Sequence, residues 1–316
     1  MGNFKKKVVL IGNGMLPSLC AKHLIERPDV DLSFIVVDDS PQRYGTGLEN
    51  AAEKFNIPFK KVQKIRGSEI ERRVQELRPN FLLSICNSQI LRPELLSACE
   101  VAINFHNSLL PTYAGSNSCT WAIFKGEKNF GVTFHLIEGE VDSGAIILQK
   151  SYPIPDNATA GHLLLTGAHR GFELFKEGID LVLNNIMPPR HQQLTERTYF
   201  TAKERPNDGW FNFHWSTSEC LRFLRAFDYG PLQSPVGLPR IKIKDKILYV
   251  STGRESKSPV PNIPEGSIHL IDDGITVRVK DGLIELTSFF TEDMRKLSLS
   301  EVIAEYKIQD KMILSN

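Results

Sequence analysis

The stretch Val8-Val9-Leu10-Ile11-Gly12-Asn13-Gly14-Met15-Leu16-Pro17 decides the class of fold, because it joins a buried strand to a helix through a glycine turn. The consecutive apolar residues at its start indicate a strand covered on both faces, as in a parallel sheet. Gly12-Asn13-Gly14 is typical of a tight turn, and Pro17 suits the first turn of a helix. The chain therefore opens with the strand–turn–helix unit of an α/β protein.

Short apolar runs and helix-like stretches alternate through the first half of the chain, which is typical of a parallel α/β sheet. We expect strands at residues 8–11, 32–37, 58–62, 81–86, 101–105, 132–137 and 145–150. We expect helices at residues 17–26, 49–55, 69–77, 93–98 and 160–183. The pattern predicts a Rossmann-like sheet, in which ligands bind at the carboxyl ends of the strands.

The pattern changes beyond a proline-rich segment, Met187-Pro188-Pro189-Arg190. Ser216 and Glu219 predict the capped start of a helix, and alternating apolar residues then predict a small, OB-like β-barrel. Its expected strands are residues 241–243, 247–250, 268–271, 275–279 and 283–286, with turns at Asp273-Gly274 and Asp281-Gly282. We therefore expect a large domain at residues 1–188, a linker at 189–206 and a small domain at 207–316.

The composition excludes several classes of protein. Of 316 residues, 41% are hydrophobic, and 38 Lys and Arg stand against 37 Asp and Glu, a net charge of +1 that provides no field to attract a polyanion. No apolar run approaches the ~20 residues that span a bilayer, and the first residues hold no signal peptide. The cysteines match neither a disulfide framework nor a zinc site. We expect a cytoplasmic protein with no metal and no membrane partner.

The first candidate site is the turn Gly12-Asn13-Gly14, with Asp38 and Asp39 at the end of the second strand. Together they imitate a dinucleotide-binding fingerprint. Pro17, however, stands where that fingerprint needs a third glycine for close packing of helix on strand. We interpret the segment as a structural turn, and a nicotinamide-dependent oxidoreductase is the alternative that it leaves open.

The second candidate site follows the strand at residues 101–105. Asn104 and His106 are two residues apart on an extended strand, so their side chains leave on the same side. Asp142 follows the next strand, where its carboxylate can reach the imidazole, favour the protonated ring and fix its orientation. The spacing alone also fits structural roles for these residues in turns.

Acyl transfer to an amine needs this set of groups. The attacking amine loses a proton, the leaving nitrogen gains one, and negative charge develops on the carbonyl oxygen. Histidine moves protons near neutral pH, and an amide N–H₂ stabilises the oxyanion without titrating. The residues therefore suit acyl transfer without a protein nucleophile.

The surrounding segments resemble the family of formyltransferases that use 10-formyltetrahydrofolate. The family pattern, Asn-x-His followed by Ser-Leu-Leu-Pro and later by Asp-x-Gly, implies a catalytic triad of Asn104, His106 and Asp142. The matching segments are residues 104–111, 113–115, 121–127, 131–135 and 141–144. The resemblance implies that residues 1–188 form the catalytic domain, and that 10-formyltetrahydrofolate is the formyl donor, tetrahydrofolate the product and no metal is needed.

The resemblance also implies a folate pocket made of two loops, each at the carboxyl end of a strand. The first loop is Asn87, Ser88, Gln89, Ile90 and Leu91. The second, contributing largely backbone contacts, is Leu136, Ile137, Glu138, Gly139, Glu140 and Val141. The implied acceptor loop contains Ser108, Tyr113 and Gly115.

The distribution of charged residues bears on the identity of the formyl acceptor. The order of a large and a small domain resembles methionyl-tRNA formyltransferase, but residues 205–316 hold 15 basic and 15 acidic side chains, whereas a domain that holds tRNA is expected to be basic. The basic loop of the tRNA enzymes is replaced by Ser40-Pro41-Gln42-Arg43-Tyr44-Gly45-Thr46-Gly47, with one Arg and no Lys. We therefore expect tRNA not to be the acceptor.

Residues 113–123 and 225–231 resemble formyltransferases of nonribosomal peptide assembly, which act on an amino group held by a carrier protein. We predict a folate-dependent N-formyltransferase whose acceptor is a primary amine of an amino acid, of a carrier-bound group or of a small molecule, with a homodimer as an assembly to test. The alternatives are an amino-sugar nucleotide N-formyltransferase, a methionyl-tRNA formyltransferase, a 10-formyltetrahydrofolate hydrolase, a non-catalytic binding module and the nicotinamide-dependent oxidoreductase.

Overall fold

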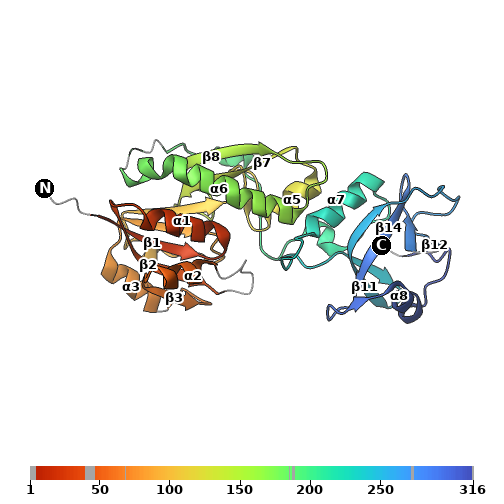
Figure 1. Ribbon diagram of the computed structural model, residues 1–316. Coiled ribbons are helices and arrows are strands. Elements are labelled where there is room, and N and C mark those ends of the chain that lie inside the picture. Colours follow the sequence, from red (N-terminus) through yellow and green to blue (C-terminus); the bar gives the residue numbers. More distant parts are fainter. Residues whose placement is uncertain are drawn as a thin grey trace. The chain divides into compact units, whose positions relative to one another are not determined.

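The computed structural model describes residues 5–39, 47–67, 69–184, 186, 189–271 and 274–314 (Figure 1). The chain divides into two compact units. The first comprises Met1–Ser116, Asn129–Pro153 and Leu164–Phe200, and the second comprises Asn117–Lys128, Ile154–Leu163 and Thr201–Asn316. The sequence-based boundaries at 188 and 207 remain predictions. Residues 40–46, most of the segment that stands in place of the basic loop of the tRNA enzymes, and the turn residue Asp273 lie outside the described residues.

A seven-stranded sheet forms the centre of the first unit, with strand order β3-β2-β1-β4-β5-β7-β8. The strands are β1 (Lys6–Gly12), β2 (Val30–Asp38), β3 (Phe59–Val62), β4 (Phe81–Ile85), β5 (Val101–His106), β7 (Asn129–Leu136) and β8 (Ile146–Pro153). The strands from β1 to β5 pair in parallel. The predicted Rossmann-like α/β class is therefore confirmed.

The last two strands of this sheet run in the opposite direction. β7 pairs antiparallel with β5, and β8 pairs antiparallel with β7. The chain returns from β7 to β8 through the short loop at residues 137–145, which contains no crossover helix, and parallel neighbours need a crossover. The carboxyl end of β7 therefore lies at the opposite edge from the carboxyl ends of the parallel strands. Each predicted folate loop therefore follows the carboxyl end of its own strand, but the two strand ends lie at opposite edges of the sheet.

The helices associated with this sheet are α1 (Met15–Ile25), α2 (Gly47–Lys54), α3 (Glu69–Leu77), α4 (Pro93–Leu96) and α6 (Ala160–Leu183). On one face, α6 packs against Phe105 of β5 and Phe134 of β7. The Phe134 and Phe175 rings lie 5.9 Å apart, and a Cβ at Gly171 would come within 2.6 Å of the Phe105 ring. Glycine at position 171 thus allows α6 to approach the sheet closely.

The opposite face carries a second core. Ile70 and Val74 of α3 and Leu95 of α4 form a buried cluster with apolar residues of β1, β2 and β4, and Ala102 of β5 packs against it. Because side chains alternate along a strand, the residues that follow Ala102 on this face are Asn104 and His106. The sheet therefore directs the predicted catalytic residues away from α6.

The second unit contains an antiparallel half-barrel with strand order β10-β11-β14-β13-β12 and with β15 paired to β14. The strands are β10 (Arg240–Ile243), β11 (Lys246–Glu255), β12 (Ile268–Ile271), β13 (Gly274–Arg278), β14 (Leu283–Phe290) and β15 (Lys296–Leu297). Its helices are α5 (Ser118–Lys125), α7 (Thr217–Phe227), α8 (Leu299–Tyr306) and the short 3-10 helix η2 (Pro206–Gly209). The predicted capping box of Ser216 and Glu219 is present at the start of α7.

Two helices of this unit were not predicted. α8 begins at a second capping box, Ser298 with Glu301, which the sequence displays as plainly as the first. α5 belongs to the second unit although it lies between strands of the first. Its Phe124 ring packs at 5.7 Å from Trp215 and 6.1 Å from Phe223. Local periodicity does not predict contacts between residues so far apart in the chain.

Candidate active site

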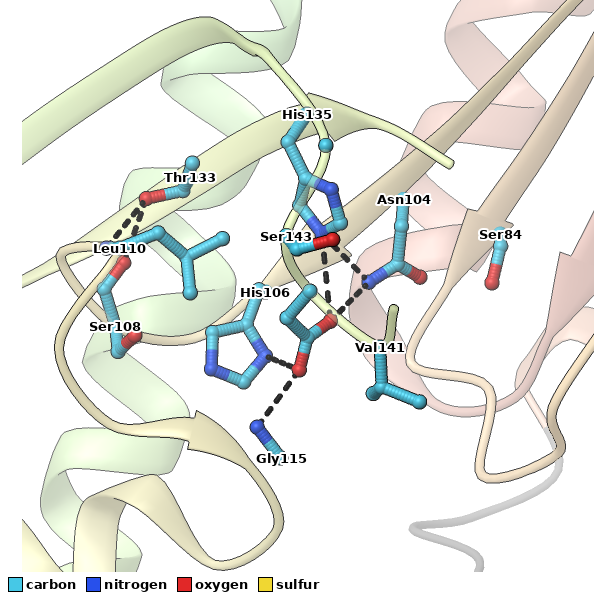
Figure 2. A network of polar contacts seen from close by, with 12 residues as sticks. Ser84, Asn104, His106, Ser108, Leu110, Gly115, Thr133, His135, Val141 and Ser143 are labelled. Carbon is cyan, nitrogen blue, oxygen red and sulfur yellow. Dashed lines mark hydrogen bonds and ion pairs between the residues drawn. The ribbon is translucent and has the colours of Figure 1, made fainter. Parts of the chain in front are cut away.

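β5 places Asn104 and His106 on one face of the sheet, as the two-residue spacing predicts (Figure 2). The antiparallel partner β7 places two polar residues directly opposite, because Asn104 pairs with His135 and His106 pairs with Thr133. Figure 2 shows the side chains of Asn104, His106 and His135 gathered on this face. The site is therefore built on two adjacent strands rather than on flexible loops alone.

His135 is a site residue that the sequence prediction missed. It is 2% exposed, and its Nδ1 lies 2.8 Å from the carbonyl oxygen of Leu136, so Nδ1 carries a hydrogen and donates it. Its Nε2 lies 3.2 Å from the amide nitrogen of Asn104. The spacing of Thr133 and His135 on a predicted strand was the signal available, but the pairing of that strand with residues 101–106 was needed to use it.

The Asp142 carboxylate joins these groups. Its Oδ2 lies 3.4 Å from Nδ1 of His106, and its Oδ1 lies 3.4 Å from Nε2 of His135. Oδ2 also accepts the Gly115 N–H at 2.8 Å, and Oδ1 accepts the Asn104 amide at 3.3 Å. Burial raises the pKa of the Asp142 carboxyl, but the two imidazoles and the Gly115 N–H outweigh burial and hold this pKa well below its usual range. Asp142 is therefore ionised at neutral pH.

The loop at residues 137–145 brings Asp142 to this position by turning back over the face of the sheet. Asp142 itself has a left-handed backbone, with φ of 56°. Gly144 passes so close to the preceding strand that an added Cβ would lie 1.9 Å from the carbonyl oxygen of Leu136. Only glycine fits there, which explains the Asp-x-Gly pattern in physical terms.

Both ring nitrogens of His106 face oxygen acceptors. Nε2 lies 2.7 Å from the carbonyl oxygen of Tyr113, which can only accept, so Nε2 carries a hydrogen. Nδ1 faces the ionised Asp142 carboxylate. Asn104 likewise contacts His135 and Asp142 through its amide nitrogen. The N–H groups of His106 and Asn104 are thus already bonded to other residues. A substrate that accepts a hydrogen bond from either side chain has to replace one of these partners.

The predicted acceptor-loop residues have different surroundings. Ser108 is fully buried, and its hydroxyl donates to the carbonyl of Thr112 at 2.7 Å, so it holds the turn together. Tyr113 presents its carbonyl to His106 and is 7% exposed. Gly115 presents its N–H to Asp142. Direct contact of these residues with a substrate stays a prediction.

The first predicted folate loop is anchored to the end of β2. The Asp38 carboxylate accepts the N–H and the hydroxyl of Ser88 at 2.8 and 2.6 Å, and the Gln89 amide at 3.0 Å. Leu91 is buried in the core under α3 and α4, whereas Ile90 is 74% exposed. Asp38 therefore serves as a structural anchor, which supports the interpretation of the glycine turn as structural.

Asn87 shapes the same loop, because its amide donates to the carbonyl of Gln89 at 2.7 Å. In the second loop, Ile137 donates its N–H to the carbonyl of Ala102 at 2.9 Å. Residues 138–141 are exposed, and Leu136 and Ile137 are half-buried. The part of this loop that a ligand can reach is thus its tip, Glu138, Gly139, Glu140 and Val141.

The described residues hold no cluster of three or more His, Cys, Asp or Glu side chains that could bind a metal ion. The five cysteines, all among the described residues, form no disulfide. Among the helices that the structure describes, none is long and apolar enough to cross a membrane.

A Rossmann-like sheet carrying a buried carboxylate, two imidazoles and an amide is equipped for acyl-group transfer. Residues 6–177 match the family model described as formyl transferase, and this span contains Asn104, His106 and Asp142. The chain belongs to the formyl transferase family. The predicted family and the prediction of a formyltransferase enzyme are confirmed.

Several relatives resemble most of the chain. A methionyl-tRNA formyltransferase of Clostridium acetobutylicum is 28% identical over 98% of this chain and 99% of its own. A GDP-perosamine N-formyltransferase of Brucella melitensis is 28% identical over 82% of this chain and 97% of its own. The crystal structure of an N-formyltransferase from Helicobacter canadensis, in complex with folinic acid and dTDP-3-aminofucose, is 20% identical, has a TM-score of 0.67, and covers 93% of this chain and 100% of its own.

Proposed function

We propose that this enzyme transfers the formyl group of 10-formyltetrahydrofolate to a primary amine. The observation that carries the proposal is the convergence of the Asn104 amide, the His106 imidazole and the ionised Asp142 carboxylate. Formyl transfer needs a group that moves a proton between two nitrogens and a donor for the charge that develops on the formyl oxygen. These side chains supply both.

His106 moves the proton in this proposal. Its Nε2 hydrogen is directed at the Tyr113 carbonyl. After the acceptor amine has bonded to the formyl carbon, the donor nitrogen takes the place of that carbonyl and receives the Nε2 proton of the protonated ring as its own bond to the formyl carbon breaks. The ring then takes up the proton that the attacking amine loses. Asp142 stays ionised beside Nδ1, where it stabilises the charged ring and fixes its orientation.

Asn104 supports the formyl oxygen. Its amide nitrogen faces Asp142 and His135, and it donates to the oxygen by giving up one of these contacts. A neutral amide is suited to this role because it donates at every pH at which the enzyme is folded.

The residues present fit a folate donor. The exposed Ile90 and Val141 provide apolar surface on two different loops, and the exposed tip of the second loop provides backbone groups for a polar ring edge. Ser88, Gln89 and Leu91 act on the shape of the first loop, because the first two are bonded to Asp38 and the third is buried. The complex of the Helicobacter canadensis relative with folinic acid supports the same class of donor.

A small-molecule or carrier-bound amine is our first candidate for the acceptor. The neutral balance of residues 205–316 supports it, because a tRNA-binding domain takes most of its affinity from phosphate contacts. The similarity to a GDP-perosamine N-formyltransferase also supports a small-molecule amine.

Methionyl-tRNA is the second candidate. It is favoured by one observation: methionyl-tRNA formyltransferases match nearly the whole of this chain and nearly the whole of their own length. If tRNA is the acceptor, a neutral second half has to bind it with few phosphate contacts, and the KM for tRNA should rise only weakly with salt.

One experiment separates these candidates. The protein is given 10-formyltetrahydrofolate with three acceptors in parallel: a carrier-bound amino acid, an amino-sugar nucleotide and methionyl-tRNA. We expect formylation of one of the first two, and its loss in His106→Ala but not in the exposed control His162→Gln. Formylation of tRNA alone would refute the argument from charge. Formate release without an amine would indicate the hydrolase, and light scattering on the same preparation tests the predicted homodimer.

A further inference from the structure

The segment at residues 190–200, predicted from sequence as part of a linker, contacts both loops that meet His106. One loop carries Asp142, and the other carries the Tyr113 carbonyl. We propose that Gln192 and Arg197 are positioning residues that hold the Asp142 loop in the geometry required for proton transfer. The proposal deepens the proposed function and rests on it.

Gln192 holds the backbone of the Asp142 loop directly. Its amide nitrogen donates to the carbonyl oxygen of Asp142 at 2.9 Å and to that of Gly144 at 2.7 Å. One side-chain amide thus bridges the two residues that define the Asp-x-Gly turn. The side-chain carboxylate of Asp142 is directed by a backbone whose position Gln192 fixes.

Arg197 holds the same loop one residue earlier. Its guanidinium donates to the carbonyl oxygen of Val141 at 2.7 Å and pairs with the Glu140 carboxylate at 3.3 Å. The guanidinium carbon lies 4.8 Å from the centre of the Tyr199 ring, which supports its orientation. Three backbone carbonyls of the loop, those of residues 141, 142 and 144, therefore accept hydrogen bonds from this segment.

The loop needs this external support. Asp142 has a left-handed backbone, which residues other than glycine rarely adopt. The bonds within the loop are made by Ser143, whose hydroxyl donates to the carbonyls of Glu138 and Glu140. These bonds do not involve the backbone of Asp142. The catalytic carboxylate is thus carried beside the exposed loop tip, on a turn in which the backbone carbonyl of Asp142 is bonded to Gln192.

The same segment also fixes the second loop. Thr198 accepts the N–H of Tyr113 through its hydroxyl at 2.7 Å and the N–H of Ala114 through its carbonyl at 2.8 Å. The strands β6 (Ala114–Gly115) and β9 (Tyr199–Phe200) then pair in parallel. The Asp142 carboxylate and the Tyr113 carbonyl, the two oxygen partners of His106, are therefore both held by residues 190–200. This segment contains the 3-10 helix η1 (Leu194–Glu196).

The test compares Gln192→Ala and the isosteric Gln192→Glu, which lacks the donor hydrogens, with the control Gln193→Ala, whose side chain is exposed. We expect kcat to fall about tenfold in Gln192→Ala and further in Gln192→Glu, with both KM values nearly unchanged, because a small displacement of a catalytic group costs turnover. We also expect the acid limb of the pH profile of kcat to move, because the Asp142 carboxylate is displaced from the rings of His106 and His135. Gln193→Ala should match the wild type.

A double variant distinguishes positioning from a general structural role. If Gln192 acts through Asp142, Gln192→Ala causes no further loss of kcat in an Asp142→Asn background. An equal loss in both backgrounds would overturn the proposal. Arg197→Met should behave as Gln192→Ala does, and Arg197→Lys, which keeps one donor, should recover part of the turnover.

A readout without catalysis separates this proposal from the proposed function. The ring nitrogens of His106 in 15N-histidine-labelled protein should change their chemical shifts in Gln192→Ala but not in Gln193→Ala. Unchanged shifts overturn the positioning role whether or not the wild type forms a formylated amine. Absence of formyl transfer by the wild type, with the shifts changed as expected, refutes the proposed function alone.

Discussion

Nδ1 of His106 lies 3.4 Å from Oδ2 of Asp142, and the two residues are only 8% and 9% exposed. Water screens a pair at this depth much less than a pair on the surface. Removing one partner leaves the other buried without a group that compensates its charge. The resulting loss of folding free energy is larger than the net contribution of the intact pair. Substitutions at this pair should therefore affect both stability and activity.

Asp142→Asn should lower kcat about 10²-fold or more, because the neutral amide no longer stabilises a charged His106 ring. It should also change the dependence of stability on pH. The folded-state pKa of Asp142 lies below the unfolded value of ~3.9, so the ionised carboxylate stabilises the fold above that value, and this contribution is lost as the pH falls toward the folded-state pKa.

Urea unfolding of the wild type and Asp142→Asn at a series of pH values tests this. The difference in free energy of unfolding should shrink as the pH falls below about 4. A difference that grows on acidification contradicts the inferred direction of the pKa.

His135→Gln should reduce kcat about 10-fold to 100-fold while leaving the KM for the donor nearly unchanged. His135 contacts one carboxylate oxygen of Asp142 and His106 contacts the other; the more flexible amide of glutamine lacks the rigid ring that fixes this contact. Steady-state kinetics at saturating acceptor provide the measurement, with the exposed His162→Gln as control. Wild-type turnover in His135→Gln would assign His135 to packing only.

Gly144→Ala should destabilise the fold by about 1–3 kcal/mol and displace the Asp142 loop. The reason is steric, since the new methyl group would lie 1.9 Å from the carbonyl oxygen of Leu136. Thermal unfolding and kcat are both measured. The control is Gly67→Ala, where an added Cβ meets no atom within 4 Å; its cost of about 1 kcal/mol from a positive φ should leave kcat unchanged.

Asp38→Ala should raise the KM for 10-formyltetrahydrofolate several-fold with a smaller effect on kcat. It removes the carboxylate that holds Ser88 and Gln89 and so loosens the first folate loop. Asp39→Ala, which removes a 3.9 Å ion pair with Lys61 and leaves the Asp38 carboxylate in place, is the matched control. Addition of NADH should shift the melting temperature of neither protein, and a shift lost in Asp38→Ala would revive the oxidoreductase alternative.

Much of the fold could be predicted because it is encoded locally. Buried parallel strands are continuous apolar runs, and the capped start of α7 is written in Ser216 and Glu219. The direction of β7 could not be predicted from its own residues, since an apolar run reads the same in parallel and antiparallel neighbours. That direction places the carboxyl end of β7 at the other edge and His135 opposite Asn104.

By itself, the sequence determined the alternating α/β architecture, the shared face of Asn104 and His106, and, through resemblance, the formyltransferase family. These properties depend on residues close in the chain, where periodicity and steric rules act. Only the tertiary structure decided that Asp142 lies between two imidazoles, that Asp38 anchors a loop, and that Gln192 and Arg197 hold the catalytic turn. Those contacts join residues many positions apart, and no local pattern specifies which distant backbone carbonyl a side-chain amide will reach.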